Sequence, residues 1–326
     1  MALTIINAAL TRQLLPVSEC IDVMETAMLA ASSRTVAVPP RMSTPLGDNS
    51  ASLMLMPGSS RELGCYGAKV IGLHPDNPGK DLPAIQGFVV LFDYLTGAPL
   101  ALVEGATLTA IRTAAASGLA TRLLAREDAK SCGIFGTGVQ AISHIDAMCA
   151  VRPLEKILLW GRNMDKTRAL AARQAEITGL NILASENPVD VGSCDLVCTV
   201  TASATPVLMG DWVQSGAHVN LVGSHTLSTR EADTELVAGS AVYVDLLESA
   251  INESGDVMIP VQEGRLDRGH IRGEIGQLLS GEIAGRTDPG QITLYKSLGN
   301  TAQDLYAAAH VYKKALELNL GLTADF

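Results

Sequence analysis

Two basic residues in the first third of the chain stand in apolar surroundings, and a third follows a pair of prolines. Lys69 lies within "YGAKVIG", Arg112 within "TAIRTAA" and Arg41 within "PPRM". A buried cation is costly unless it is paired, so Lys69 and Arg112 each require an internal salt bridge or an anionic ligand. The pattern by itself leaves both interpretations open.

His225 is a further residue that could do chemistry. It follows the apolar run "HVNLVGS", residues 218–224, which has the character of a buried strand that ends at a glycine. In an open α/β sheet, ligands bind beyond the carboxyl ends of the strands. His225 is therefore a candidate catalytic group or hydrogen-bond donor, and a solvated turn residue is the alternative.

A glycine-containing loop at residues 136–141 has the spacing of a dinucleotide-binding turn. The stretch "CGIFGTGVQA" places G-x-G-x-x-A directly after an apolar strand and before a helix. Gly136 permits the tight turn, Gly138 lets the backbone approach a pyrophosphate, and Ala141 lets the helix pack close to the strand. The helix N-terminus offers N–H groups to the anion, and a plain glycine turn is the alternative. The predicted cofactor contacts in this loop are Gly136, Thr137, Gly138, Val139 and Gln140.

The residues after the second strand of this pattern indicate which dinucleotide binds. An NAD-selective site usually ends that strand with an acid, about 20 residues beyond the glycine loop. Here "KILLW" is followed by Gly161, Arg162 and Asn163, without a carboxylate at the strand tip. Arg162 can pair with a 2′-phosphate and Asn163 can donate to it, which favours NADPH. The alternative is a solvated Arg162, with Asp165 binding the ribose.

Two threonines follow a later strand of the same pattern. Thr199 and Thr201 stand in "CTVTASATP", directly after the apolar run "DLVC". They are candidates to line the nicotinamide side of the site, and the alternative is that they are turn residues which satisfy their own backbone.

The elements that must position these residues show two patterns. A helix over residues 16–33 precedes β-like runs at "ASLMLMP", "YGAKVIG", "GFVVLFDYL" and "APLALVEG", and Thr96-Gly97 joins the last two in a tight hairpin. A long helix from Ala106 then leads into strands that alternate with helices, which predicts a parallel sheet covered on both faces. The predicted fold class is α/β, a Rossmann-type domain plus an α+β domain with an antiparallel meander. We expect the helix "TAQDLYAAAHVYKKALEL" to return to the first domain.

Composition excludes several classes of protein. The chain has 326 residues, 47% of them apolar and 18% charged, which is typical of a compact two-domain protein. With a net charge of −10 and scattered basic residues, nucleic acid is not an expected partner. No apolar run reaches the roughly 18 residues of a membrane span and no signal-peptide pattern opens the chain, so we expect a cytoplasmic protein. The six cysteines show no second ligand pair, so we expect free thiols and no metal site.

Several stretches together resemble the ornithine cyclodeaminase and mu-crystallin family. The similarity runs from about residue 39 to residue 310 and depends on "LMLMPG", "YGAKVIGLHPDNPGKDLP", "LFDYLTGAPLALVEGATLTAIRTAAAS", "GIFGTGVQA" and "YKSLGNTAQDLYAAA", in that order. It implies a substrate-binding domain of residues 1–113 and 298–326, which dimerises through its sheet, and a Rossmann domain of residues 114–297. The implied assembly is a homodimer.

The resemblance also implies roles for individual residues. Arg41, Lys69 and Arg112 fall where the family binds the substrate carboxylate, which favours the anionic ligand over the internal salt bridge. The implied substrate-binding set is Arg41, Met56, Lys69, Arg112 and Leu298. The further cofactor contacts that it implies are Arg112, Thr113, Asn220, Val222, Gly223 and Leu298.

One departure from the family bears on the reaction. The resemblance implies that ornithine cyclodeaminases carry an aspartate just after this strand, within "GGD" or "GAD". This chain has Gly223, Ser224 and His225 there instead. A histidine near neutral pH cannot act as that anion toward a substrate amine, which argues against cyclodeamination of ornithine.

Other members of the family resemble imine reductases, and they supply the expected activity. We expect NAD(P)H-dependent reduction of a cyclic imino acid, Δ1-pyrroline-2-carboxylate to L-proline, with Δ1-piperideine-2-carboxylate as a further substrate. NADPH is the expected cofactor and NADH the alternative; Lys69 or His225 supplies the proton, directly or through water. The alternative functions are ornithine cyclodeamination, an alanine-type amino acid dehydrogenase, and a non-catalytic, crystallin-like protein that binds NADPH.

Overall fold

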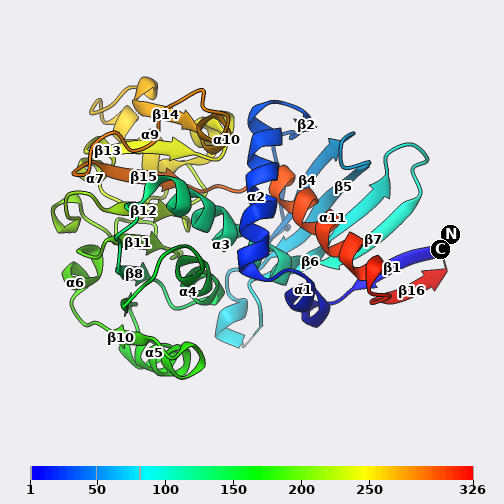
Figure 1. The fold of residues 1–326 in the computed structure, drawn as a ribbon, viewed down its shortest axis with the longest axis horizontal. Helices are drawn as coiled ribbons and strands as arrows, with labels where there is room; N and C mark the ends of the chain where they lie inside the picture. The colour runs from blue at the N-terminus through cyan, green and yellow to red at the C-terminus, as the bar shows by residue number, and fades with distance from the viewer. Residues whose placement is uncertain (1, 49, 81, 326) are drawn as a thin grey trace. The chain divides into compact units, whose positions relative to one another are not determined.

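The computed structural model describes residues 2–48, 50–80 and 82–325, which divide into two compact units. Unit 1 consists of Met1–Arg112 and Gly299–Phe326, and unit 2 of Thr113–Leu298. Unit 1 contains a mainly antiparallel sheet and unit 2 a parallel one (Figure 1). The predicted α/β fold class is thereby confirmed.

The sheet of unit 1 is built around an antiparallel meander. Its strands are β1 (Ala2–Ile6), β2 (Val36–Ala37), β3 (Met42–Pro45), β4 (Ser52–Ser60), β5 (Cys65–Leu73), β6 (Ile85–Asp93), β7 (Pro99–Glu104) and β16 (Leu322–Asp325). The strand order is β16-β1-β7-β6-β5-β4-β2, and β3 also pairs with β4. The predicted meander is β4 to β7, and Gly97, at φ +71°, turns the chain between β6 and β7. No local pattern predicted the pairing of β1 with both β7 and β16.

Helices of unit 1 pack against this sheet. They are α1 (Ala8–Leu14), α2 (Val17–Ser32) and α11 (Thr301–Glu317), with a 3-10 turn at Asn77–Lys80. The helices α2 and α11 lie side by side, and α11 also contacts β4, β5 and β6 (Figure 1). Asn300 caps α11, because its Oδ1 accepts from the N–H of Gln303 at 3.3 Å. The first turn of α11, which carries Asp304, is thereby fixed beneath the strands.

Unit 2 is a doubly wound parallel sheet. Its strands are β8 (Ser131–Phe135), β9 (Lys156–Trp160), β10 (Asn181–Ala184), β11 (Leu196–Thr199), β12 (His218–Leu221), β13 (Ser240–Val244), β14 (Ile271–Glu274) and β15 (Ile292–Lys296). The order is β10-β9-β8-β11-β12-β15-β13-β14, and every pair is parallel. Every residue of β11, β12 and β13 is buried, as expected for strands covered on both faces.

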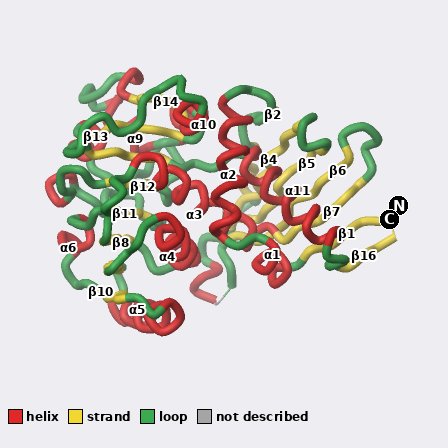
Figure 2. Tube along the Cα trace, viewed as in Figure 1, coloured by secondary structure: helices red, strands yellow, loops and turns green. Residues whose placement is uncertain are grey.

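The helices that alternate with these strands complete unit 2 (Figure 2). They are α3 (Gly105–Leu124), which begins in unit 1, and α4 (Val139–Val151), α5 (Met164–Thr178), α6 (Pro188–Gly192), α7 (Thr234–Ala238), α8 (Leu247–Glu253), α9 (Gly255–Gln262) and α10 (Ile275–Leu279), with 3-10 turns at Gly210–Trp212 and Arg268–His270. In the described parts of the chain, none of the helices has both the length and the apolar character that crossing a membrane requires.

Candidate functional site

A buried ion cluster in unit 1 joins three elements that are far apart in the sequence. Lys69 on β5 and Arg112 on α3 both contact Asp304 in the first turn of α11. The Nζ of Lys69 lies 2.8 Å from Oδ2 of Asp304, and the Nε of Arg112 lies 3.0 Å from Oδ1. The side chains of Lys69 and Asp304 are only 2% and 0% exposed. The structure therefore supplies the internal salt bridge that the apolar surroundings of Lys69 and Arg112 required.

The charges of this cluster do not balance. Arg41 donates from Nη2 to the carbonyl of Gly299 at 2.8 Å, and Arg112 donates from Nη1 to Oε1 of Gln303 at 2.7 Å. A Cβ at Gly299, whose φ is +73°, would lie 2.5 Å from Nη1 of Arg112, so the backbone approaches the guanidinium closely. Two cations thus contact the carboxylate of Asp304, and the charge of Arg41 also acts on Lys69. Such a surplus suits an anionic ligand.

The cluster shifts the titration of its members. Burial lowers the pKa of Lys69 to about 7, and the positive charge of Arg112 adds to this effect, while Asp304 opposes it. Burial by itself would raise the pKa of Asp304, but the charges of Arg112 and Lys69 outweigh it and lower that pKa. Near neutral pH, Asp304 is therefore an anion, and Lys69 is poised to exchange a proton.

Met56 is the remaining substrate candidate on the sheet of unit 1. It lies on β4 directly opposite Lys69 in the antiparallel register and is 3% exposed. Because residues directly opposite on neighbouring strands share a face of the sheet, Met56 places an apolar thioether beside the lysine.

The glycine loop of unit 2 has the geometry of an anion-binding turn. Gly136, at φ +127°, follows β8, and a Cβ there would lie 2.8 Å from the carbonyl oxygen of Val200. Gly138 is the N-cap of α4, and a Cβ at this position would meet nothing within 4 Å. Val139 is 64% exposed although it is apolar, whereas Ala141 is fully buried. The helix N-terminus therefore presents open backbone, which is the arrangement that receives a phosphate.

Two further residues close to this loop bear on its occupant. Thr137 lies against the end of β9, where a Cβ at Gly161 would be 2.7 Å from its Cγ2. The Oε1 of Gln140 is buried, and no hydrogen-bond partner for it lies among the residues that the structure describes. The open Gly138 and this unpaired oxygen fit a dinucleotide whose phosphates approach α4.

The tip of β9 has no carboxylate pointing back at the loop. Arg162 is exposed, and Asn163 caps α5 by accepting at Oδ1 from the N–H of Lys166 at 3.0 Å. Asp165, the alternative ribose partner, pairs instead with Arg168 at 3.4 Å. An exposed arginine at a strand tip is available to a phosphate.

The strand order of unit 2 divides its carboxyl edge into two halves. The order reverses between β8 and β11, and in folds of this kind each half binds one mononucleotide. The glycine loop and Arg162 belong to the half formed by β8, β9 and β10. A nicotinamide dinucleotide whose pyrophosphate lies at the glycine loop would place its second mononucleotide at the ends of β11 and β12.

Most of the predicted nicotinamide-side residues have buried side chains. Asn220 is 0% exposed and donates from Nδ2 to Oγ1 of Thr121 at 3.0 Å. Thr113 is 8% exposed, and Leu298, 7% exposed, donates its N–H to Oδ2 of Asp245 at 3.0 Å. Val222 and Gly223 are both half-buried.

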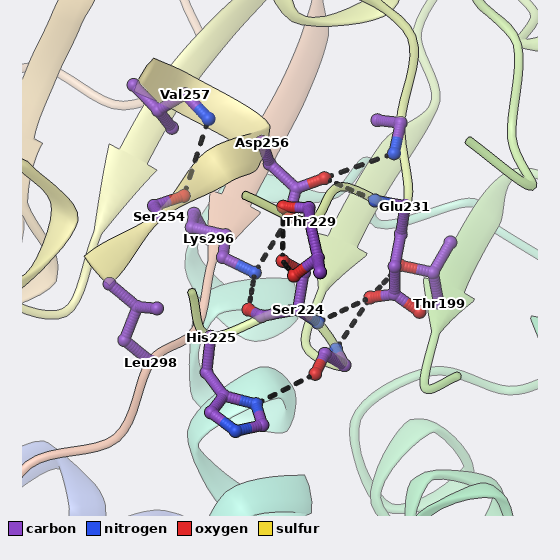
Figure 3. A network of polar contacts seen from close by, with 12 residues as sticks. Thr199, Ser224, His225, Thr229, Glu231, Ser254, Asp256, Val257, Lys296 and Leu298 are labelled. Carbon is purple, nitrogen blue, oxygen red and sulfur yellow. Dashed lines mark hydrogen bonds and ion pairs between the residues drawn. The ribbon is translucent and has the colours of Figure 1, made fainter. Parts of the chain in front are cut away.

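Thr199 and Thr201 are both bound by a buried glutamate that the sequence did not reveal, and Figure 3 shows its contact with Thr199. The Oε2 of Glu231 accepts from Oγ1 of Thr199 at 2.9 Å, and its Oε1 accepts from the N–H and the Oγ1 of Thr201, both at 2.7 Å. The N–H groups of Gly223 and Ser224 also donate to Oε2, at 2.6 and 3.3 Å. Glu231 therefore ties together the loops that follow β11 and β12.

A buried lysine and a second buried carboxylate also hydrogen-bond to the loop after β12 (Figure 3). Lys296, at the end of β15, lies 2.9 Å from Oδ2 of Asp256 and donates to the carbonyl of Ser224 at 2.6 Å. Asp256 accepts the N–H groups of Glu231 and Ala232 at 2.7 and 3.1 Å. All three charged side chains are fully buried. Burial raises the pKa of Glu231, Asp256 adds to this, and Lys296 acts in the opposite direction.

His225 leaves this network and is exposed. Its Nδ1 lies 3.2 Å from the carbonyl of Gly223, and the preceding Ser224 is anchored by a 2.6 Å hydrogen bond to the carbonyl of Thr229. The ring therefore projects from a fixed loop at the carboxyl end of β12 (Figure 3).

Sequence reasoning missed Asp304, Glu231, Asp256 and Lys296. A signal existed for Lys296, because "ITLYKS" sets a lysine at the end of an apolar run just as "YGAKVIG" does for Lys69. In the described residues, His, Cys, Asp and Glu side chains form no group of three or more that could hold a metal ion. The cysteines are free, and all except Cys149 are buried.

Comparison with known proteins gives matches over nearly the whole chain. The sequence model of the ornithine cyclodeaminase/mu-crystallin family matches residues 4–319. A Δ1-pyrroline-2-carboxylate reductase of Bacillus cereus is 36% identical, over 99% of both chains. The ketimine reductase mu-crystallin of Mus musculus is 33% identical, over 85% of both chains. The structure of the Δ1-pyrroline-2-carboxylate reductase of Thermococcus litoralis, in complex with NADH and L-proline, matches with a TM-score of 0.95 and 36% identity, covering 98% of this chain and 99% of that one.

Proposed function

Because the chain belongs to the ornithine cyclodeaminase/mu-crystallin family, we propose that it reduces a cyclic imino acid, Δ1-pyrroline-2-carboxylate, to L-proline with a nicotinamide cofactor. The observation that carries this proposal is the buried cluster of Lys69, Arg112 and Asp304, whose cations outnumber its carboxylate. The names of the similar bacterial and archaeal reductases support the same substrate. Δ1-Piperideine-2-carboxylate, with one more methylene, is the proposed second substrate.

The reaction places two requirements on the protein. The imine carbon accepts a hydride, which the reduced cofactor supplies when bound, and the nitrogen accepts a proton, so that C=N becomes CH–NH and the cofactor leaves oxidised. The imino acid must therefore be held by its carboxylate, with the imine carbon and the cofactor in contact during turnover. Arg41 and Arg112 are the proposed carboxylate ligands, since an arginine fork matches a carboxylate. Met56 and Leu298 are the proposed apolar contacts of the ring.

Lys69 is the proposed proton donor to the imine nitrogen. Its pKa, lowered to about 7 by burial and by Arg112, lies where a group can both hold and release a proton at neutral pH. Asp304 orients the ammonium through a 2.8 Å contact. His225 is the second candidate, because it is exposed at the end of β12 and an imidazole can donate a proton.

The proposed cofactor is NADPH, bound by unit 2. The glycine loop at residues 136–140 takes the pyrophosphate, and Gly161, Arg162 and Asn163 take the 2′-phosphate of the adenine ribose. The exposed Arg162 at the tip of β9 supports this preference, since an NAD-selective site would carry an acid there. NADH remains the alternative, and it is the cofactor in the solved complex of the Thermococcus litoralis relative.

The remaining contacts and the organisation follow from the same proposal. Arg112, Thr113, Thr199, Thr201, Asn220, Val222, Gly223 and Leu298 are the further proposed cofactor contacts. Thr199 and Thr201 would act mainly through their backbone, because their hydroxyl groups already donate to Glu231. Residues 114–297 form the proposed cofactor domain, with 1–113 and 298–326 as the substrate-binding and dimerisation domain of a cytoplasmic homodimer.

A substrate panel with both cofactors tests this proposal. Purified protein is given NADPH or NADH with Δ1-pyrroline-2-carboxylate, Δ1-piperideine-2-carboxylate, or pyruvate with ammonia, and NAD⁺ with L-ornithine. Oxidation of NADPH with the pyrroline is the expected result. Consumption of pyruvate and ammonia would identify an alanine-type dehydrogenase, and ammonia released from ornithine a cyclodeaminase. Tight NADPH binding without turnover on any compound would indicate a crystallin-like binding protein.

A further inference from the structure

Glu231 is a fully buried carboxylate that the proposed reaction does not use. Its hydrogen-bond partners are neutral, namely the hydroxyl groups of Thr199 and Thr201 and the backbone N–H groups of Thr201, Gly223 and Ser224. The backbone N–H groups that Glu231 accepts, together with Lys296, favour its ionised form, whereas burial and the charge of Asp256 raise its pKa. Burying this charge requires a reason beyond connecting two loops.

The charges behind Glu231 do not neutralise it. Lys296 pairs with Asp256 at 2.9 Å and donates its other hydrogen bond to the carbonyl of Ser224. Asp256 in turn accepts the backbone N–H of Glu231, so the network has two carboxylates for one lysine. Among the residues that the structure describes, the network at the ends of β11 and β12 therefore has more carboxylates than ammonium groups.

The position of this surplus matters because of the sheet topology. The strand order reverses between β8 and β11, and the glycine loop after β8 assigns the adenine half to β8, β9 and β10. The ends of β11 and β12, which Glu231 binds directly, belong to the nicotinamide half. A nicotinamide ring gains a positive charge when it gives up a hydride. A negative charge fixed behind that half favours the oxidised ring, because it attracts the oxidised ring and not the neutral reduced one.

We propose that Glu231 is a positioning residue with an electrostatic effect: it fixes the loops after β11 and β12, and it makes unit 2 bind the oxidised cofactor more tightly relative to the reduced one. Through the same effect it assists hydride departure toward the imine. This inference depends on the nicotinamide cofactor of the proposed function and not on the identity of the imine.

A glutamine at position 231 could not accept all of the hydrogen bonds that Glu231 accepts. A carboxamide offers one oxygen, and its NH₂ group would face donors such as the N–H of Gly223, 2.6 Å from Oε2 in the structure. Glu231→Gln therefore removes the charge at nearly constant volume, whereas Glu231→Asp keeps the charge and shortens the side chain. The two variants separate charge from geometry.

Calorimetric titration of the full-length protein with NADPH and with NADP⁺ tests the proposal. The measured quantity is the ratio of the Kd for NADPH to the Kd for NADP⁺, and no imine is present. Glu231→Gln is expected to lower this ratio about fivefold, because one unit charge is removed from a low-dielectric region. Glu231→Asp is expected to weaken both affinities and keep the ratio. Glu248→Gln, which removes an exposed carboxylate of unit 2, is the matched control and leaves the ratio unchanged.

Asp256→Asn keeps the test decisive should Glu231→Gln fail to fold. It also removes one buried negative charge, and it is expected to lower the ratio by less, because the charge of Asp256 is already paired with Lys296 at 2.9 Å. A ratio that stays unchanged in whichever of these variants folds would overturn the proposal, since a purely structural role changes both affinities by the same factor. A shifted ratio in a protein that reduces no imine would refute the proposed substrate alone.

Discussion

Each unit buries a three-membered ion cluster, and the two clusters have opposite surplus charge. In unit 1, Lys69 and Arg112 share the one carboxylate of Asp304, so the surplus is positive. In unit 2, Lys296 pairs with Asp256, and Asp256 accepts the backbone N–H of Glu231, whose own carboxylate has hydroxyl and N–H donors as its hydrogen-bond partners, so the surplus is negative. Neither imbalance is expected of a group buried for stability alone, because a buried charge without a partner is costly.

We infer from this difference that the surplus charge of each cluster is opposite in sign to the charge of the ligand proposed for its unit. An imino acid brings a carboxylate, which a surplus of cations accommodates, and the oxidised nicotinamide ring brings a positive charge, which a surplus of carboxylate accommodates. The two clusters also differ in exchangeability. The pKa of Lys69 is lowered to about 7, so the cluster of unit 1 can pass on a proton, whereas the carboxylate of Glu231 is enclosed by hydrogen-bond donors.

The largest effect is expected from removing the exchangeable proton of unit 1. Lys69→Met is expected to lower kcat for imine reduction by about 10²- to 10⁴-fold, the usual contribution of a general acid, while NADPH affinity stays unchanged. His225→Asn is the matched comparison, with a loss of less than about tenfold. Steady-state kinetics and NADPH titration measure both. A larger loss in His225→Asn than in Lys69→Met would move the proton donor to unit 2.

Removing an arginine from the same cluster tests the carboxylate clamp. Arg112→Met is expected to lower kcat/KM about 10²- to 10³-fold, because truncation of one partner of a buried charge pair costs roughly 2–5 kcal/mol. Arg61→Met, at an exposed position of unit 1, is the control and keeps wild-type kinetics. Circular dichroism establishes that both variants fold. Wild-type KM and kcat in a folded Arg112→Met protein would mean that the positive surplus does not hold the substrate.

Arg162 places a positive charge at the tip of β9, and its replacement tests the preference for NADPH. Arg162→Asp is expected to lower the preference for NADPH over NADH at least tenfold, since an acid repels the 2′-phosphate and can accept from the ribose. Arg173→Asp, on the helix α5 that follows Arg162, is the exposed control. The ratio of kcat/KM for the two cofactors is the measurement. An unchanged ratio would remove Arg162 from the cofactor site.

The smallest expected effect is a displacement of the pH profile. Because the pKa of Lys69 is lowered to about 7, its protonated fraction falls as pH rises through that value, so kcat/KM for reduction decreases on the alkaline side. The rate of L-proline oxidation rises over the same pH range, because the reverse reaction needs Lys69 in its neutral form. Asp304 raises the pKa of Lys69, so Asp304→Asn is expected to shift the alkaline decrease toward lower pH, while Asp48→Asn at an exposed site has no effect. If Asp304→Asn leaves the pH profile unchanged, Lys69 is not the group whose titration the profile reports.

The features that the sequence could predict are local. The meander β4 to β7 follows from alternating apolar runs and the Thr96-Gly97 turn, and the glycine loop follows from spacing within residues 136–141. The place of β15 between β12 and β13 could not be predicted, because strand order is set by packing and not by neighbouring residues.

The members of the two buried clusters were harder to predict from the sequence, because their contacts are also set by packing. Lys69 could be singled out because a cation in an apolar run needs a partner, but nothing in the sequence identifies that partner as Asp304, which is 235 positions away. Glu231 and Asp256 are not flanked by a motif that indicates burial, and they meet only because α9 packs against the loop after β12.

Transfer of deuterium tests the central claim most directly. Wild-type protein is incubated with Δ1-pyrroline-2-carboxylate and NADPH that carries deuterium at C4, with the 4R and 4S forms used separately, and the product is examined by NMR. The account predicts L-proline with deuterium at Cα from one of the two forms and unlabelled L-proline from the other. Absence of proline, or proline without deuterium from either form, would contradict it.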